Sequence, residues 1–164
     1  MGSVGTRCWV ALLIGRDEED PLFLQVKEAE ASVLEPYLGR SRYAQHGQRV
    51  VEGQRLTQAA SDILLGWNRV DGFDGRTHDY YFRQLWDEKA SPAIEKFAPP
   101  GMTIYAQICG YTLARAHARS GDSVALAGYL GSGASMARAM TRFAVAYADQ
   151  NEADYRQFIA SVDH

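Results

Sequence analysis

The sequence predicts an α+β fold, in which a small antiparallel sheet with one crossing helix is followed by a helical bundle. Short runs of apolar and β-forming residues, separated by turn residues, fill the first half of the chain. Apolar residues recur at helical spacing in the second half, and the two halves meet at Pro99-Pro100-Gly101. We therefore expect a sheet-plus-helix unit over residues 1–98 and a helical unit over residues 99–164, together forming one compact or truncated domain.

Composition and charge exclude several classes of protein. The chain has 164 residues, of which 46% are hydrophobic and 23% are charged. These ordinary globular values exclude a disordered tail, a collagen-like fibre and a coiled-coil rod. Lysine and arginine number 17 against 20 acidic residues, a formal charge of −3, so we expect no nucleic-acid partner. No apolar run approaches the ~20 residues of a membrane-spanning helix, so we expect no membrane association.

The cysteines and histidines give no metal-binding pattern. Cys8 and Cys109 stand far apart, and neither they nor the four histidines show metal-ligand spacing, so we expect no metal site. We expect both cysteines to be reduced; a single disulfide in a secreted chain is the alternative. The N-terminus lacks the basic and apolar regions of a signal peptide, so the expected location is cytoplasmic.

The first two strands are expected over residues 8–14 and 22–29, as a hairpin joined by an acidic turn that contains Gly15 and Pro21. Alternation divides the side chains of the second strand between two faces: Leu22, Leu24 and Val26 on one, Phe23, Gln25 and Lys27 on the other. Residues 32–38 predict one short helical turn, disturbed by Pro36.

A helix is expected over residues 43–60, although Gly47 and Gly53 each weaken it by ~1 kcal/mol relative to alanine. Helical spacing places four of its residues on one face: Glu52, Leu56, Ala59 and Ala60. Two further strands are predicted over 63–70 and 78–86, joined by a turn with two Asp-Gly steps. Helices are predicted after the joint: 103–119, 135–149 and 153–162, the last two separated near Asn151.

Three features occur in an order that favours phosphate binding: the glycine turn Gly2-Ser3-Val4-Gly5, then Lys27, then Glu52. Glycine lets a backbone approach phosphate oxygens closely, and lysine brings a compact positive charge to a polyanion. A helix carboxylate holds such a lysine in place. Each feature also has an ordinary interpretation: the turn joins two strands, Lys27 is solvated, and Glu52 pairs with Arg49 or Arg55 at helical spacing.

A second polar group, His117, Arg119 and Asp122, is superficially similar to the catalytic loop of protein kinases. Here the aspartate is not adjacent to the arginine, Ala127 stands where that loop has asparagine, and no Asp-Phe-Gly follows. The alternative, in which His117 and Asp122 cap and pack a helix end, is favoured.

Six blocks of sequence resemble a bacterial family catalogued as domain of unknown function 2252. They are Gly-Ser-Val-Gly-Thr-Arg (2–7), Leu-Phe-Leu-Gln-Val-Lys-Glu-Ala (22–29), Ser-Val-Leu-Glu-Pro-Tyr (32–37), His-Gly-Gln-Arg-Val-Val-Glu-Gly-Gln-Arg-Leu (46–56), Leu-Ala-Arg-Ala-His-Ala-Arg-Ser-Gly-Asp (113–122) and Ala-Tyr-Ala-Asp-Gln-Asn-Glu (146–152). The resemblance spans nearly the whole chain.

The resemblance implies a distant relationship to protein kinases and aminoglycoside phosphotransferases, with residues 1–98 similar to a kinase-like small lobe. Family members are longer, and their Gly-Asp-x-His-x-x-Asn and Asp-Phe-Asp segments lie upstream of the glycine turn, so this chain is expected to be a C-terminal part. The resemblance carries over Lys27 and Glu52 as the lysine–acid pair, and Gln84–Leu85 as the border of the adenine. It implies ATP with Mg²⁺ as ligand of the intact protein, and no phosphotransfer by this chain alone.

Partners follow from the same argument. We expect a nucleotide, and either the missing upstream half or a second copy of the chain, because a part of a fold leaves apolar area exposed. Self-association is therefore predicted. The alternative function is a non-catalytic structural or protein-interaction domain, in which Lys27 and Glu52 only stabilise the fold.

Overall fold

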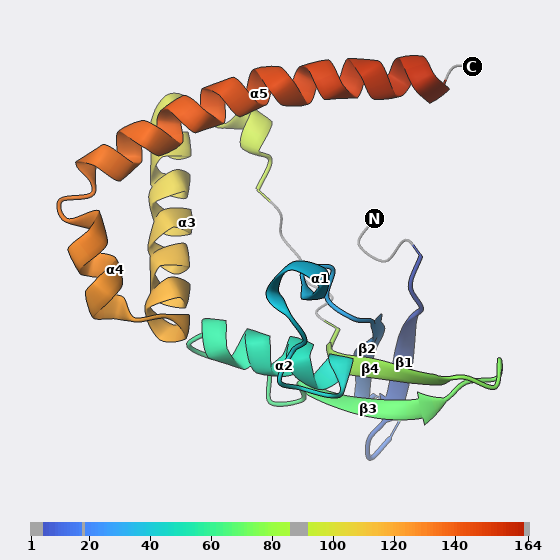
Figure 1. The fold of residues 1–164 in the computed structure, drawn as a ribbon. Coiled ribbons are helices and arrows are strands. Elements are labelled where there is room, and N and C mark those ends of the chain that lie inside the picture. The colour runs from blue at the N-terminus through green and yellow to red at the C-terminus, as the bar shows by residue number, and fades with distance from the viewer. Residues whose placement is uncertain (1–4, 18, 86–91, 163–164) are drawn as a thin grey trace. The chain divides into compact units, whose positions relative to one another are not determined.

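The computed structural model describes residues 5–17, 19–85 and 92–162. The chain divides into two compact units, Met1–Ser120 and Gly121–His164. The first unit contains a four-stranded antiparallel sheet and the helices that follow its strands, and the second contains two helices (Figure 1). The predicted α+β class is confirmed. The boundary that we predicted at residue 98 differs from this division, which keeps the first long helix with the sheet.

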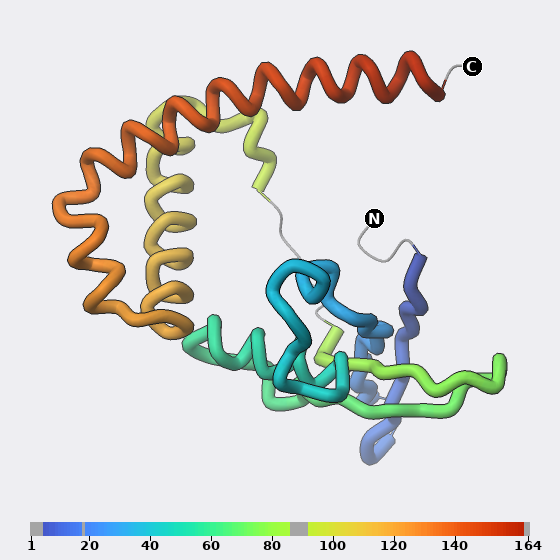
Figure 2. Tube along the Cα trace, in the orientation of Figure 1, coloured from blue at the N-terminus to red at the C-terminus, as the bar shows by residue number. Residues whose placement is uncertain are grey.

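The sheet has the strand order β1-β2-β4-β3, and its elements follow one another along the tube of Figure 2. Its strands are β1 (Cys8–Ile14), β2 (Pro21–Ala29), β3 (Gly66–Asp71) and β4 (Thr77–Gln84). The two predicted hairpins are present, and the Asp-Gly turn closes through a 2.7 Å bond from Gly72 N to Arg76 O. Strand β3 begins later than predicted because Asp62 holds the preceding residues in a turn, accepting from Leu64 N at 2.8 Å.

Helix α2 (His46–Thr57) crosses the sheet and is shorter than the predicted 43–60. The Gln45 side chain caps its start by accepting from Gln48 N. The predicted apolar stripe through Glu52 is wrong, because the buried residues are Gly47 and Val51. A Cβ on Gly47 would lie 2.1 Å from Tyr80 O, so glycine is what allows the helix to approach β4.

Two short elements and one long helix complete the first unit. They are α1 (Glu35–Leu38), the 3₁₀ helix η1 (Ile94–Lys96) and α3 (Pro99–Ser120). We predicted this helix to begin at residue 103, after the joint at Pro99-Pro100-Gly101, but it begins at Pro99. Proline is tolerated in the first turn of a helix, where backbone N–H groups have no helical partner.

The second unit consists of α4 (Ser123–Leu130) and α5 (Ala134–Val162). Gly131 and Gly133, with φ of +52° and +75°, make the turn between them. The predicted break near Asn151 is wrong, because α5 is continuous. A side-chain pair four residues apart, Gln150 with Asp154, spans this point, and a second pair, Glu152 with Arg156, follows it.

The last three helices of the chain, α3, α4 and α5, contain no buried residue. Among the described residues, none of the helices combines the length and the apolarity that crossing a membrane requires. Because these three helices bury none of their residues, exposed apolar side chains run along them, including Phe143, Tyr147 and Phe158 on α5.

Candidate functional site

Lys27 lies in the middle of β2, in a row of residues that crosses all four strands. In the register, Lys27 is paired with Cys8 of β1 and with Tyr81 of β4, and Tyr81 is paired with Trp67 of β3. Directly paired residues project from the same face of a sheet. The half-buried Lys27 side chain therefore shares a face with Cys8, Tyr81 and Trp67.

Helix α2 covers part of this face. Asp79, two residues before Tyr81, accepts a 2.7 Å hydrogen bond from His46 N at the start of the helix. Farther along α2, the Arg55 guanidinium lies over the Trp67 ring, 5.7 Å from its centroid. Burial raises the pKa of Tyr81, as expected for a side chain in this covered layer. Lys27 is therefore on the same side of the sheet as α2.

The structure does not bring Lys27 and Glu52 together as an ion pair. Glu52 instead pairs with Arg55 at 3.5 Å, one of the alternatives that the sequence left open. Arg55 Nη2 also donates to Leu65 O at 2.8 Å, and this bond holds the guanidinium beside the Glu52 carboxylate. Within the described part of the chain, no carboxylate lies within 4.0 Å of the Lys27 ammonium.

Of the predicted glycine turn, Gly2 and Ser3 lie outside the described residues. Gly5 has φ of +82°, a left-handed conformation that glycine adopts without strain, and a Cβ there would meet nothing within 4 Å. It precedes Arg7 and β1. Gly5 thus precedes β1, the strand that pairs with the strand of Lys27.

Gln84 and Leu85 end the last strand, and their backbone N–H groups are already used. Gln84 N donates to Asp62 Oδ2 at 2.6 Å, and Leu85 N donates to Phe23 O at 2.8 Å. A base bordered by these residues would have to use their carbonyl oxygens or side chains. The predicted adenine contact stays a prediction.

The three residues of the second predicted site have separate environments. Arg119 Nε donates to Leu56 O at 3.1 Å, at the carboxyl end of α2. Asp122 caps α4 by accepting from Val124 N and Ala125 N, both at 3.0 Å. His117 is exposed. Two of the three therefore satisfy helix ends, which is the alternative that the sequence favoured for Asp122.

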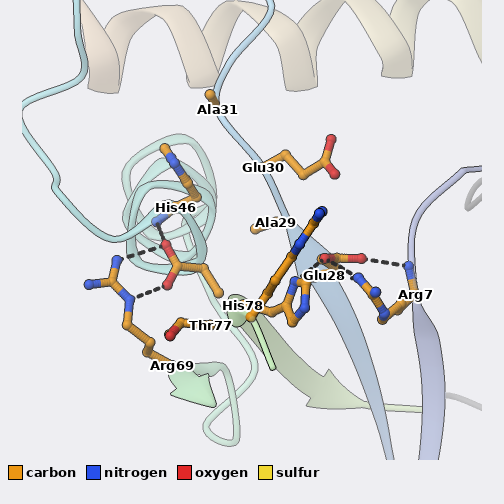
Figure 3. A pocket seen from close by; sticks show the side chains of 11 residues that line it. Arg7, Glu28, Ala29, Glu30, Ala31, His46, Arg69, Thr77 and His78 are labelled. Carbon is orange, nitrogen blue, oxygen red and sulfur yellow. Dashed lines mark hydrogen bonds and ion pairs between the residues drawn. The ribbon is translucent and has the colours of Figure 1, made fainter. Parts of the chain in front are cut away.

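Sequence reasoning missed a cleft of ≈ 640 Å³ at the end of the sheet (Figure 3). Its lining comes from β2, β4, the residues beside them and the start of α2: Arg7, Glu28, Ala29, Glu30, Ala31, His46, Arg69, Arg76, Thr77, His78 and Asp79. Arg7 and Arg69 stand on opposite sides of it (Figure 3).

One wall of the cleft is a four-residue charged network. Glu28 accepts from Arg7 N at 2.9 Å and from Arg7 Nη1 at 2.8 Å, and it contacts His78 Nδ1 at 2.8 Å. Asp74 pairs with Arg7 Nη2 at 2.8 Å and with His78 Nε2 at 3.0 Å. The network ties the start of β1 to β2 and to the turn before β4.

These contacts lower the pKa of both carboxyl groups. Burial of Glu28 acts to raise its pKa, but the backbone hydrogen bond from Arg7 and the charge of its guanidinium outweigh burial and hold the pKa below its ordinary value. At Asp74, the hydrogen bond from His78 is the main cause of a lowered pKa. Both groups are therefore charged at neutral pH.

The other wall is built on Asp79. Arg69 donates to it at two points, Nε to Oδ1 at 2.5 Å and Nη2 to Oδ2 at 3.0 Å. The Arg69 hydrogen bond is the main cause of the lowered Asp79 pKa, with burial opposing it and the His46 N–H adding to it. The alternation predicted for β2 places Glu28 opposite Lys27, but only the register joins it to Arg7 and His78.

No group of three or more histidine, cysteine, aspartate or glutamate side chains is arranged to hold a metal ion in residues 5–17, 19–85 and 92–162. The comparisons with known proteins give one match. Residues 1–161 match the model of a family described as an uncharacterized protein conserved in bacteria (DUF2252). No curated protein and no solved structure matches the chain.

Proposed function

Because the chain belongs to the bacterial family DUF2252, whose description states no activity, we propose a function from its residues: the first unit binds the phosphates of a nucleotide, ATP with Mg²⁺, at Lys27. One observation carries the proposal. Lys27 is half-buried on the face beneath α2 and has no carboxylate partner among the described residues. A half-buried ammonium group without an anion is unfavourable, and a phosphate group supplies the missing charge.

Apolar side chains beside Lys27 support a nucleoside on the same face. Cys8, Val10 and Leu12 alternate along β1 and project on the Lys27 side, and all three are exposed. A base lying on this strip would bury apolar area next to the phosphates. Gln25 and Arg83, which hydrogen-bond at 3.2 Å on the same face, offer polar groups beside it.

We propose that Glu52 holds Lys27 when the nucleotide is bound. Its present pair with Arg55 is long, at 3.5 Å, and both side chains are partly exposed. Exposed ion pairs contribute about 0–1 kcal/mol, so exchanging one partner for another costs little. The Mg²⁺ ion would bind together with the nucleotide, coordinated by its phosphates, whose charge it would neutralise, and we assign no separate metal site.

We also propose that this polypeptide transfers no phosphoryl group by itself. Its sequence contains neither Gly-Asp-x-His-x-x-Asn nor Asp-Phe-Asp, the segments that would supply a base and metal ligands. ATP turnover by the purified chain, measured as phosphate release, would contradict this.

Mg·ATP binding measured by calorimetry on three proteins tests the site. The wild type should bind, Lys27→Ala should bind at least about tenfold more weakly, and Lys96→Ala should bind like the wild type. Lys96 is the matched control because it is an exposed lysine on η1. Absence of binding by the wild type, or equal binding by wild type and Lys27→Ala, would overturn the proposal.

The second candidate is a non-catalytic interaction domain whose partner is another copy of the chain. It is favoured by the exposed apolar side chains of α5, among them Met140, Phe143 and Tyr147. On this view no protein in the calorimetric series binds Mg·ATP, and the chain associates in solution.

A further inference from the structure

The cleft at the end of the sheet exposes guanidinium groups to a ligand, while two of its acids are buried behind them. The side chains of Glu28 and Asp79 are each 6% exposed. Their partners are far more accessible: Arg7 is 42% exposed and Arg69 is 52% exposed. A molecule entering the cleft therefore meets the guanidinium groups of Arg7 and Arg69 before it meets the carboxylates of Glu28 and Asp79.

The ion pairs leave one nitrogen of each guanidinium group, on Arg69 and on Arg7, without a partner among the described residues. Arg69 uses Nε and Nη2 for Asp79 and Nη2 again for Ala44 O, which leaves its Nη1. Arg7 uses Nη1 and Nη2 in the charged network, which leaves its Nε. Two guanidinium groups are thus oriented by buried carboxylates before any ligand arrives, which reduces the entropy lost on binding.

A third guanidinium group, that of Arg76, has no partner among the described residues. Arg76 lines the cleft, and among the described residues its side chain forms no hydrogen bond or ion pair. His46 adds a ring nitrogen, Nδ1, that is buried and without a hydrogen-bond partner in the described part of the chain. Of these two groups, the exposed Arg76 guanidinium is available to a ligand without breaking an existing contact.

One acid on the cleft opposes anion binding. Glu30 is exposed and lines it, with no hydrogen bond or ion pair from its carboxylate to the described residues. Against it stand the three guanidinium groups, of which only Arg76 lacks a carboxylate partner. His78 offers a ligand no free ring nitrogen, because both its ring nitrogens already contact carboxylates.

We propose that this cleft binds a tetrahedral oxyanion, a phosphate ion or the phosphoryl group of a small molecule, between Arg7, Arg69 and Arg76. Planar forked donors suit such oxygens, and three of them line this cleft, from the residue before β1, from β3 and from the turn before β4. The site is separate from Lys27, which does not line the cleft, and it does not depend on nucleotide binding there.

The probe is inorganic phosphate, titrated into ¹⁵N-labelled protein against sodium chloride at matched ionic strength. The Nε–Hε signals of Arg7 and Arg69, together with the backbone signals of these residues and of His78, report binding in the cleft. We expect saturable shifts with phosphate, about tenfold weaker binding in Arg76→Ala, and wild-type binding in Arg16→Ala. Arg16 is the control because it is an exposed arginine in the β1–β2 turn.

Glycerol 3-phosphate distinguishes the two sources of the oxyanion. Tighter binding than inorganic phosphate assigns the site to a phosphoryl group of a larger molecule, and equal or weaker binding assigns it to the free ion; both results uphold the site. Arg76→Lys, which keeps the charge but not the fork, should bind with intermediate affinity and serves if Arg76→Ala fails to fold.

Three results would overturn the site: shifts no larger than those caused by chloride, equal weakening in Arg76→Ala and Arg16→Ala, or phosphate binding that Lys27→Ala abolishes and Arg76→Ala retains. If the site is as proposed, Lys27→Ala binds phosphate with the affinity of the wild type. Failure of the nucleotide proposal, seen in the Mg·ATP titrations, therefore leaves this test unaffected.

Discussion

Arg69 and Asp79 lie directly opposite one another in the register of β3 and β4, and their side chains form a two-point ion pair. The same carboxylate accepts the backbone N–H of His46, which has no partner within helix α2. One buried acid thus joins two strands and the helix that lies over them. The position of α2, and with it that of Glu52, depends on this residue.

Replacing Asp79 with asparagine should destabilise the first unit. The amide keeps the volume but loses the charge that the guanidinium and the helix N-terminus both favour. We expect a loss of about 2 kcal/mol in the free energy of unfolding, measured by urea denaturation. Asp149→Asn, on the exposed surface of α5, is the control and should change the stability by less than about 0.5 kcal/mol.

Two glycines of α2 should respond in opposite directions to alanine. Gly53→Ala places a methyl group in open space and should stabilise the helix by about 0.5–1 kcal/mol. Gly47→Ala forces that group against Tyr80 O, 2.1 Å away, so helix and strand must separate. Thermal unfolding of the two variants should show a higher midpoint for the first and a lower one for the second. Equal midpoints would mean that α2 does not approach β4 this closely.

Stability should depend on pH through Glu28 and Asp79. Both have a folded-state pKa below the ordinary values of 4.5 and 3.8, so their contribution is present above about pH 4.5 and is lost as the pH falls through the lowered values. The free energy of unfolding should therefore decline in acid. Glu28→Gln should flatten part of that decline, whereas Glu95→Gln, an exposed residue, should keep the wild-type profile.

Glu52→Gln tests the exchange of partners proposed for the nucleotide site. Because the Glu52–Arg55 pair is partly exposed, its loss should change the free energy of unfolding by no more than about 1 kcal/mol. Mg·ATP affinity should nevertheless fall several-fold, since Lys27 loses the acid that would position it. Unchanged affinity would remove Glu52 from the site and leave Lys27 alone.

The exposed apolar face of α5 predicts self-association. The wild type should scatter light as a species larger than the 18.2 kDa chain, in a concentration-dependent manner. Phe143→Glu should reduce its size, because Phe143 stacks on Tyr147 on the exposed surface of the helix. A monomer at high concentration would contradict the prediction.

Local patterns in the sequence were sufficient for much of the first unit. Alternation along β2 correctly placed Lys27 and Val26 on opposite faces, and the Asp-Gly steps located the β3–β4 turn. Two local rules led to errors. Pro99 begins α3 because the first turn of a helix tolerates proline, and Asn151 lies inside α5, where the Gln150–Asp154 pair spans it.

The amino-acid sequence by itself determined which residues alternate along the strands and where the hairpin turns lie, since each depends on near neighbours in the chain. Only the tertiary structure decided which charges meet. Arg7 and Asp74 are separated by 67 residues, and strand register brings them together around Glu28 and His78. Register likewise placed Lys27 beneath α2. Glu52 did not pair with it as predicted, but with Arg55, three residues farther along the same helix, one of the alternatives that the sequence left open. Side-chain pairing between strands depends on the strand order and register of the whole sheet, which no short segment contains.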